Sequence, residues 1–326
     1  MTTPQEPVGS GFGPAATAFE VMAGISLAGR VAVVTGGYSG LGKVTSAALA
    51  AAGASVIVPS RDRAKAEAEL GRVPGISIAR LDLTDPASID AFGREILSST
   101  QPLDLLICAA GVMATPLFRD RDGHEGQFAT NHLGHYRLAC TLWPALLAAE
   151  GARVVSVSSR GHQIAGIDFD DVDFESRGYD KWSAYGQSKT ANALFARALD
   201  RRGAAKGVRA FSLHPGQILT GLARHLSAEE MAGFDATDEQ GAPRIDPERG
   251  MKTPEQGAAT ILWCATSTRL NGLGGVYCED CEVALPQAET DGTKGVAPWA
   301  MDPQAAERLW LLSEQLTGLS LGGRPG

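Results

Sequence analysis

The sequence predicts an α/β fold formed by a single domain: a doubly wound parallel sheet of about seven strands with helices on both faces. Three observations support this prediction. Short apolar runs alternate with longer helix-forming runs along the chain. The first apolar run passes through a glycine-rich turn into a helix-forming run. The 326 residues, 44% of them hydrophobic, suffice for one large domain with a substantial core.

The segment Val31–Lys43, VAVVTGGYSGLGK, opens the predicted sheet. An apolar strand leads into glycines at Gly36, Gly40 and Gly42, and a helix follows from Lys43. Glycines let a phosphate approach the backbone, and a helix N-terminus offers free N–H groups to it. The spacing is neither Gly-x-Gly-x-x-Gly nor a P-loop, so this segment alone also fits a turn that binds no ligand.

The remaining elements follow in alternation. Apolar, β-favouring runs predict further strands at 55–59, 76–81, 103–109, 153–157, 208–213 and 275–278. Helix-forming runs predict helices at 15–23, 43–52, 64–70, 86–98, 125–147, 185–202 and 254–265. This order is typical of a parallel sheet in which each strand is followed by a crossover helix.

Two segments stand outside the alternation. Residues 1–26 are expected to form an N-terminal arm, mobile over its first 14 residues, which are rich in Pro, Gly and Thr. Residues 27–326 then form the domain. Residues 221–251 lack strong periodicity and predict a lid over a substrate site.

Composition excludes several classes of protein. The net charge of -8 argues against nucleic-acid binding, which needs a basic surface. The five widely spread cysteines do not resemble a disulfide framework, and Cys278 and Cys281 have no second pair to complete a zinc site. No signal peptide or membrane span is recognisable, so we expect a cytoplasmic protein without a membrane partner.

Polar residues gather where the predicted strands end, which is where such sheets bind ligands. Asp82 follows the third strand, and Ser158 and Ser159 follow the fifth. Tyr185 and Lys189 are four residues apart, on one face of a predicted helix. A neighbouring ammonium lowers the pKa of a phenol toward neutrality and makes it a usable acid or base. Taken alone, the pair also fits a helix surface with an extended lysine.

Taken together, the motifs resemble the short-chain dehydrogenase/reductase family, in the branch of the retinol dehydrogenases and WW-domain oxidoreductases. The resemblance covers about residues 27–284 and implies a Rossmann fold. The motifs are Thr35-Gly36-x-x-x-Gly40-x-Gly42, Asp82-Leu83, Ala110-Gly111-Val112-Met113, Asn131-His132-Leu133-Gly134-His135, Val154 to Ser159, Tyr185-x-x-x-Ser188-Lys189 and Pro215-Gly216 with Thr220.

The resemblance implies an oxidoreductase that interconverts a carbonyl and an alcohol with a nicotinamide cofactor. Tyr185 would be the acid in reduction and the base in oxidation, and Lys189 would lower its pKa. Ser159, rather than Ser158, would hold the substrate oxygen, and Asn131 would anchor a proton-relay water. The implied cofactor site comprises Gly36, Ser39, Gly40, Leu41, Gly42, Arg61, Asp82, Leu83, Ala110, Gly111, Tyr185, Lys189, Pro215, Ile218 and Thr220.

The residues after the second strand bear on the choice between NADP(H) and NAD(H). Arg61 suits a ribose 2′-phosphate, and Ser39 offers it a further hydrogen bond. Asp62 would instead favour the free 2′-hydroxyl of NAD. We expect NADP(H), with NAD(H) as the alternative.

Two features set this chain apart from the family pattern. Cys108-Ala109-Ala110-Gly111 stands where the family usually has Asn-Asn-Ala-Gly, so we expect a local change in packing. The interval from Ser159 to Tyr185 is long, and its loop, 161–182, is expected to form one wall of the substrate pocket. Apolar pocket candidates, which favour a hydrophobic or aromatic substrate, are Met113, Ile164, Trp182, Leu222, Leu226, Met231 and Phe234.

No metal site is expected, because His132 and His135 have no suitably spaced partner and are interpreted as helix-packing residues. His162 is interpreted as a loop hydrogen-bonder. A non-redox enzyme of the same fold, such as an epimerase or dehydratase, and an NADP(H)-sensing protein are the alternative functions. The family resemblance further implies a homodimer or homotetramer.

Overall fold

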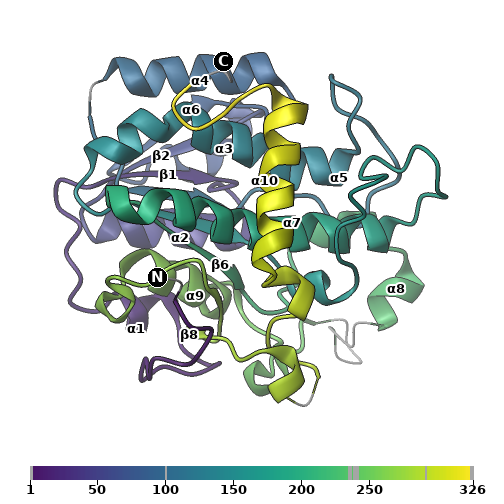
Figure 1. Ribbon diagram of the computed structural model, residues 1–326. Coiled ribbons are helices and arrows are strands. Elements are labelled where there is room, and N and C mark those ends of the chain that lie inside the picture. Colours follow the sequence, from purple (N-terminus) through teal and green to yellow (C-terminus); the bar gives the residue numbers. More distant parts are fainter. Residues whose placement is uncertain (1–2, 100, 234–236, 238–241, 291, 324–326) are drawn as a thin grey trace.

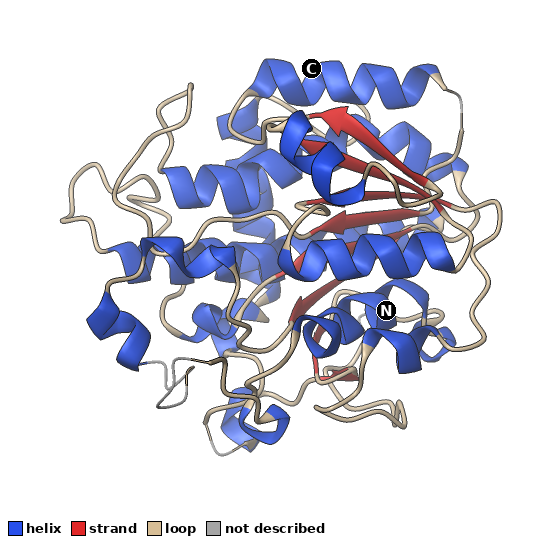
Figure 2. Ribbon diagram, turned by 180° about the vertical axis from the view of Figure 1, so that it is seen from behind, coloured by secondary structure: helices blue, strands red, loops and turns tan. Residues whose placement is uncertain are grey.

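The computed structural model describes residues 3–99, 101–233, 237, 242–290 and 292–323. Its centre is one sheet in the order β3-β2-β1-β4-β5-β6-β7-β8 (Figures 1 and 2). Neighbouring strands are parallel except β7 and β8, which are antiparallel. The strands are β1 Val31–Thr35, β2 Ser55–Ser60, β3 Ile76–Arg80, β4 Leu105–Cys108, β5 Arg153–Val157, β6 Arg209–His214, β7 Tyr277–Glu279 and β8 Glu282–Val283.

Helices cover both faces of this sheet (Figure 2). They are α1 Ala18–Met22, α2 Gly40–Ala51, α3 Arg63–Leu70, α4 Pro86–Ser98, α5 Gly126–Phe128, α6 Gly134–Ala148, α7 Lys181–Gly203, α8 Ala228–Gly233, α9 Pro254–Thr266 and α10 Pro303–Thr317. Side chains of α4, α6, α7 and α10 form the core on one face, and those of α1, α2, α3 and α9 form the core on the other.

Strand β1 contributes side chains to both cores. Its side chains alternate between the two faces, so that Val31 and Val33 join one core while Ala32 and Val34 join the other. All of β1 is buried, which explains why its sequence is continuously apolar rather than alternating. The predicted doubly wound α/β fold is therefore confirmed.

The strand order places the ligand-binding edge. From β1 the chain proceeds outward to β2 and β3 and then returns to place β4 on the other side of β1. Thr35 and Cys108 are register partners, so β1 and β4 end at the same level. A crevice opens at such a switch point, outside the carboxyl ends of the strands.

The structure differs from the prediction in the number of strands and in several element boundaries, including two helix starts. The sheet has eight strands rather than about seven, because the two-residue β8 pairs with β7 at the edge. Helix α2 begins at Gly40 rather than Lys43. Helix α7 begins at Lys181 rather than Tyr185, because the Asp180 carboxylate accepts the Ser183 N–H at 2.7 Å and caps the helix there.

Part of the N-terminal segment, which the sequence predicts to be mobile, is hydrogen-bonded to the sheet edge through Gln5, Val8 and Ser10. The buried Gln5 amide donates to the carbonyls of Tyr277 and Ala284 at 2.6 and 2.7 Å. The Glu282 carboxylate accepts the N–H groups of Val8 and Ser10, each at 2.7 Å. These bonds hold the segment against β7 and β8.

Helix α10, which the sequence analysis did not predict, lies across α7 (yellow in Figure 1). Trp310 stacks on Phe195 of α7, with ring centroids 6.3 Å apart, and meets Tyr136 of α6 edge-on at 4.9 Å. Ser313 of α10 is hydrogen-bonded to His132 at 2.7 Å. Within the described part of the chain, no helix has the length and apolar character needed to span a membrane.

Candidate active site

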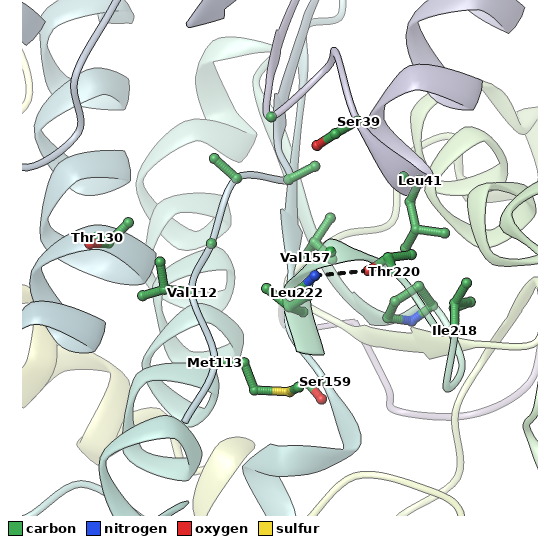
Figure 3. Close-up of a pocket in the computed structure, with 18 of the residues that line it drawn as sticks. Ser39, Leu41, Val112, Met113, Thr130, Val157, Ser159, Ile218, Thr220 and Leu222 are labelled. Carbon is green, nitrogen blue, oxygen red and sulfur yellow. Dashed lines mark hydrogen bonds between the residues drawn. The ribbon is translucent and has the colours of Figure 1, made fainter. Parts of the chain in front are cut away.

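A cleft of about 1040 Å³ lies at the carboxyl ends of the strands. The glycine-rich turn after β1 forms one end, and residues following β5 together with α7 form the other. Figure 3 shows Ser39 at the first end and Met113 with Ser159 at the second. This cleft therefore lies at the switch point predicted from the strand order.

The glycine-rich turn is shaped for close backbone approach. Gly36 has a φ of 66°, and a Cβ there would lie 2.9 Å from the Ala110 Cα atom. A Cβ at Gly42 would collide with the Gly36 carbonyl oxygen. Because α2 begins at Gly40, its free N–H groups lie beside the cleft, and the hydroxyl of the N-cap residue Ser39 makes no capping bond. This is an arrangement suited to an anionic group.

The cleft brings together every predicted cofactor-site residue. The lining residues are Gly36, Ser39, Gly40, Leu41, Gly42, Arg61, Asp82, Leu83, Ala110, Gly111, Tyr185, Lys189, Pro215, Ile218 and Thr220. Ser159 lines it too, whereas Asn131 is fully buried behind the wall. Residues that line the cleft and that the sequence analysis did not single out include Lys65, Thr130, Arg160, Gln163, Arg224 and Gln287.

The two serines after β5 have different surroundings. The Ser158 hydroxyl donates to the Lys189 carbonyl at 2.7 Å and is therefore directed into α7. The Ser159 hydroxyl accepts the Gly161 N–H at 3.0 Å and is hydrogen-bonded to the Tyr185 phenol. Of the two, only Ser159 has its hydroxyl beside Tyr185.

Tyr185 is buried, and burial raises the pKa of its phenol to about 12, while the hydrogen bond from Ser159 opposes the rise. The expected lowering of this pKa by Lys189 is not found. The Lys189 Nζ atom lies 5.8 Å from the Tyr185 ring centroid and donates to the Val157 carbonyl at 3.0 Å. Burial of Lys189 lowers the pKa of its own ammonium group to about 8. Desolvation therefore dominates the pKa of Tyr185, in place of the charge effect expected from the spacing.

Asn131 lies in a π-helical turn, Ala129–Leu133, between α5 and α6. Its side-chain oxygen accepts the Val112 N–H at 2.8 Å, and its amide donates to the Val112 carbonyl and the Ser188 hydroxyl. A Cβ on Gly111 would lie 3.0 Å from this side-chain oxygen and 3.6 Å from Lys189 Nζ. Asn131 therefore holds the segment that separates it from the cleft.

Arg61, directly after β2, and Lys65, in α3, line the cleft. Asp62 does not, since its carboxylate accepts the Lys65 backbone N–H at 3.0 Å and caps α3. Arg63, the next cation along the chain, is exposed and paired with Glu67 at 2.7 Å. Of the three cations at positions 61, 63 and 65, Arg61 and Lys65 thus line the cleft.

The end of β4 is held from β1. The Thr35 hydroxyl accepts the N–H groups of Ala109 and Ala110, at 3.0 and 3.1 Å. Thr35 thus links β1 to the residues that follow β4, next to Cys108 and Ala109. The local change in packing expected there from the sequence stays a prediction.

Several apolar side chains also line the cleft. Met113, Ile164 and Trp182 line it, as do the described insertion residues Leu222, Leu226 and Met231. Phe234, the remaining pocket candidate, lies outside the described residues. The loop 161–182 contributes Gly161, Gln163 and Ile164 to the wall.

The insertion is attached at both described ends. Glu230 of α8 binds Lys181 at 2.7 Å and accepts the Trp182 indole N–H at 3.0 Å. At the other end, the Gln217 N–H donates to the Gly250 carbonyl, and the Lys252 N–H donates to the Gln217 carbonyl. The Leu222 N–H donates to the Thr220 hydroxyl at 3.3 Å (Figure 3).

His162 is confirmed as a loop hydrogen-bonder. Its Nε2 atom accepts the Ala297 N–H at 3.0 Å, so its proton resides on Nδ1, which donates to the Ser159 carbonyl at 2.6 Å. The ring also contacts Tyr277 of β7. His162 thereby joins the loop after β5 to the C-terminal part of the chain.

The family model described as short chain dehydrogenase matches residues 30–231. A Streptomyces antibioticus protein named "Probable oxidoreductase" is 47% identical over 294 residues, which cover 88% of this chain and 97% of that protein. Human retinol dehydrogenase 14 is 36% identical over 310 residues, covering 89% of this chain and 87% of that protein.

A solved structure of an uncharacterized protein from Mycobacterium paratuberculosis has a TM-score of 0.71 and 34% identity to this chain. The match covers 94% of this chain and 99% of the other. With the family model spanning more than half of the sequence, these likenesses bear out both the fold and the branch that the motifs indicate. The chain belongs to the short-chain dehydrogenase/reductase family, in its retinol dehydrogenase-like branch, and is an oxidoreductase of CH–OH and C=O groups that uses a nicotinamide cofactor.

Proposed function

We propose that this enzyme reduces a carbonyl group on a hydrophobic or aromatic substrate with NADPH, and oxidises the corresponding alcohol in reverse. The observation that carries the proposal is the cleft itself. A phosphate-compatible glycine turn lies at one end, and the hydrogen-bonded Ser159 and Tyr185 hydroxyls, with Lys189, lie at the other. The decisive test is substrate-dependent consumption of NADPH that is lost in Tyr185→Phe.

The cleft fits a dinucleotide. The positions of Gly36 and Gly42 leave no room for a Cβ, so the turn stays close to the α2 N-terminus, where a pyrophosphate is stabilised by N–H groups and the helix dipole. Pro215, Ile218 and Thr220 line the wall beyond this turn and are proposed to hold the nicotinamide end. The bound cofactor supplies the hydride.

The preference for NADP(H) rests on the charges at the adenosine end. Arg61 and Lys65 line this end, and a guanidinium and an ammonium suit a 2′-phosphate. Asp62, the residue that argued for NAD(H), is engaged as the cap of α3. Because the Asp62 carboxylate is used in this cap, it does not compete for the ribose, which favours NADP(H). Ser39 would donate a further hydrogen bond to the 2′-phosphate.

Tyr185 is proposed as the proton donor in reduction. A phenol with a pKa of about 12 keeps its proton at neutral pH and has it to give when the carbonyl oxygen gains electrons. Ser159, bonded to the same phenol, is placed to donate to that oxygen and orient it. In oxidation the roles reverse, and Tyr185 accepts the alcohol proton.

Lys189 and Asn131 are proposed to support this step. The positive charge of Lys189 stabilises negative charge developing on the Tyr185 oxygen as its proton leaves. Its pKa of about 8 makes that support dependent on pH near neutrality. Asn131 holds the Val112 backbone, next to Gly111, which lies beside Lys189, and is proposed to anchor the proton relay.

The substrate class follows from the apolar wall formed by Met113, Ile164 and Trp182. Residues 221–251 are proposed to act as a lid over this wall, because Leu222, Leu226 and Met231 line the cleft.

The proposed domain organisation is an N-terminal arm, residues 1–26, followed by one Rossmann-type domain, residues 27–326.

Assembly and location complete the proposal. A homodimer or homotetramer would have to use surfaces other than the part of α7 that α10 covers. Five free, buried cysteines are in keeping with a reducing compartment such as the cytoplasm. A non-redox reaction on the same scaffold is the second candidate function, and net consumption of cofactor separates the two.

A further inference from the structure

We propose that His135 is a positioning residue of the cleft, because its imidazole connects the two hydrogen-bonded clamps that hold the segment leaving β4. This segment, residues 109–113, lines the cleft along its whole length. The inference rests on the proposed function, since the segment faces the space assigned there to the cofactor. The sequence alone gave His135 no role beyond helix packing.

The first clamp is Thr35, at the end of β1. Its hydroxyl oxygen accepts two neighbouring backbone N–H groups, from Ala109 at 3.0 Å and Ala110 at 3.1 Å. An oxygen with two lone pairs is fully used as an acceptor by these bonds, so its own proton must go elsewhere. The side chain is completely buried, where an unused donor would be costly.

The second clamp is Asn131, in the π-helical turn. Its side chain forms two hydrogen bonds with Val112, accepting the N–H at 2.8 Å and donating to the carbonyl at 3.0 Å. Gly111 lies between the two clamps, where a Cβ would approach both Asn131 and Lys189. The position of this segment relative to Lys189 thus depends on both clamps.

His135 joins the clamps through its two ring nitrogens. Nδ1 lies 2.9 Å from the Asn131 backbone carbonyl, and Nε2 lies 2.9 Å from the Thr35 hydroxyl. A carbonyl only accepts, so Nδ1 carries the proton and donates it. Burial lowers the pKa of His135 to about 4, so the ring is neutral and Nε2 is an acceptor. The Thr35 proton therefore goes to Nε2.

The resulting chain has one consistent direction. His135 donates to Asn131, Thr35 donates to His135, and Ala109 and Ala110 donate to Thr35. Without the imidazole, the Thr35 hydroxyl is free to rotate toward the Ile107 carbonyl, 3.3 Å away, and the π-helical turn loses its link to β1. We expect the segment 109–113 then to shift within the cleft.

His132 provides a matched control three residues earlier. It is equally buried, and burial likewise lowers its pKa, to about 3. Its Nε2 atom, however, is bonded to Ser313 of α10, on the side away from the cleft. A substitution at His132 therefore removes a buried imidazole without disturbing either clamp.

The test measures NADPH affinity by fluorescence titration of the purified full-length protein, together with the melting temperature of each variant. We expect His135→Phe and Thr35→Val each to weaken NADPH binding about tenfold, the range of one or two lost hydrogen bonds. The NADPH affinity of His132→Phe should stay within about twofold of that of the unsubstituted protein. This should hold even if its melting temperature falls as much as that of His135→Phe. His135→Gln, whose amide oxygen can accept from Thr35, should recover much of the affinity.

The double variant His135→Phe/Thr35→Val decides whether the two residues act through one chain. If His135 and Thr35 act through one chain, the double variant should bind NADPH no more weakly than the single variant with the lower affinity. Additive losses, or equal losses in His135→Phe and His132→Phe, would overturn the inference. Failure of the unsubstituted protein to bind NADPH would instead contradict the proposed function, so the two failures are distinguishable.

Discussion

Lys181 and Glu230, 49 residues apart in the chain, form an ion pair of 2.7 Å that attaches helix α8 to the beginning of α7. The same carboxylate accepts the indole N–H of Trp182, which meets the Tyr185 ring edge-on at 6.2 Å. One carboxylate thus connects the proposed lid to Trp182, a side chain that lines the cleft and contacts Tyr185.

We predict that Glu230→Ala raises the KM for a hydrophobic carbonyl substrate about three- to fivefold, because the lid loses a partly exposed ion pair and a hydrogen bond. Steady-state kinetics measures the KM for the carbonyl substrate. Titration with NADPH measures the cofactor affinity, which should stay unchanged. Glu229→Ala, at the neighbouring exposed position, is the matched control. An unchanged KM in Glu230→Ala would exclude the ion pair from substrate binding.

Arg61→Ala and Lys65→Ala should each weaken NADPH binding about tenfold and NADH binding much less, because the lost cations face a 2′-phosphate that NADH lacks. Titration with both cofactors measures the difference. Arg63→Ala, which removes an exposed arginine paired with Glu67, should change neither affinity. Equal losses for NADPH and NADH would show that Arg61 and Lys65 do not discriminate between them.

The pH dependence of carbonyl reduction should report Lys189. Burial lowers the pKa of its ammonium to about 8, whereas the Tyr185 phenol, with a pKa of about 12, remains protonated. The charge of Lys189 is therefore present below about pH 8 and lost above it. We predict that kcat for NADPH-dependent reduction declines as pH rises through 8. A rate that stays constant up to pH 10 would argue against this role.

The free energy of unfolding should begin to fall at a pH above the range in which the carboxylates become protonated. Burial lowers the pKa of four histidines to about 3 or 4: His132, His135, His162 and His214. The unfolded chain, with ordinary histidine pKa values near 6.5, binds more protons between these limits, so stability is lost as pH falls below about 6.5.

Each of these histidines contributes a slope of up to about 1.4 kcal/mol per pH unit in that range. Urea unfolding at pH 7 and pH 5, followed by tryptophan fluorescence, measures the loss. The His132→Phe variant should show a smaller difference between the two pH values. Equal stability at both pH values in the unsubstituted protein would contradict the lowered pKa values of these histidines.

Local sequence predicted the elements that carry their own signals. Strand β5 matches the predicted run 153–157, because a short apolar segment bounded by turn residues defines both ends. Helix α10 carries signals as well, with Asp302 as its cap, Pro303 in its first turn and Gly318 with a φ of 64° after its end. These signals lie at the two ends of α10, beyond the last predicted strand. Strand β8 has two residues, too few for any periodicity.

The residues of the site were predictable where a motif fixes them, as for Ser159, Tyr185 and Lys189, which share one cleft. The pKa of Tyr185 was not predictable from the sequence. The four-residue spacing from Lys189 indicates a neighbouring charge, but it does not reveal the burial that raises the pKa. The role of Thr35 depends on the pairing of β1 with β4, 70 or so residues later in the chain, which no local pattern contains.

The most direct test of the proposed function is the absorbance of reduced nicotinamide when NADPH is mixed with the enzyme and a panel of aromatic and aliphatic ketones and aldehydes. We predict a substrate-dependent loss of NADPH in the unsubstituted enzyme. Tyr185→Phe should show no loss but bind NADPH with unchanged affinity. Turnover that survives in Tyr185→Phe, or tight NADPH binding with no consumption across the panel and with alcohols in reverse, would contradict the account.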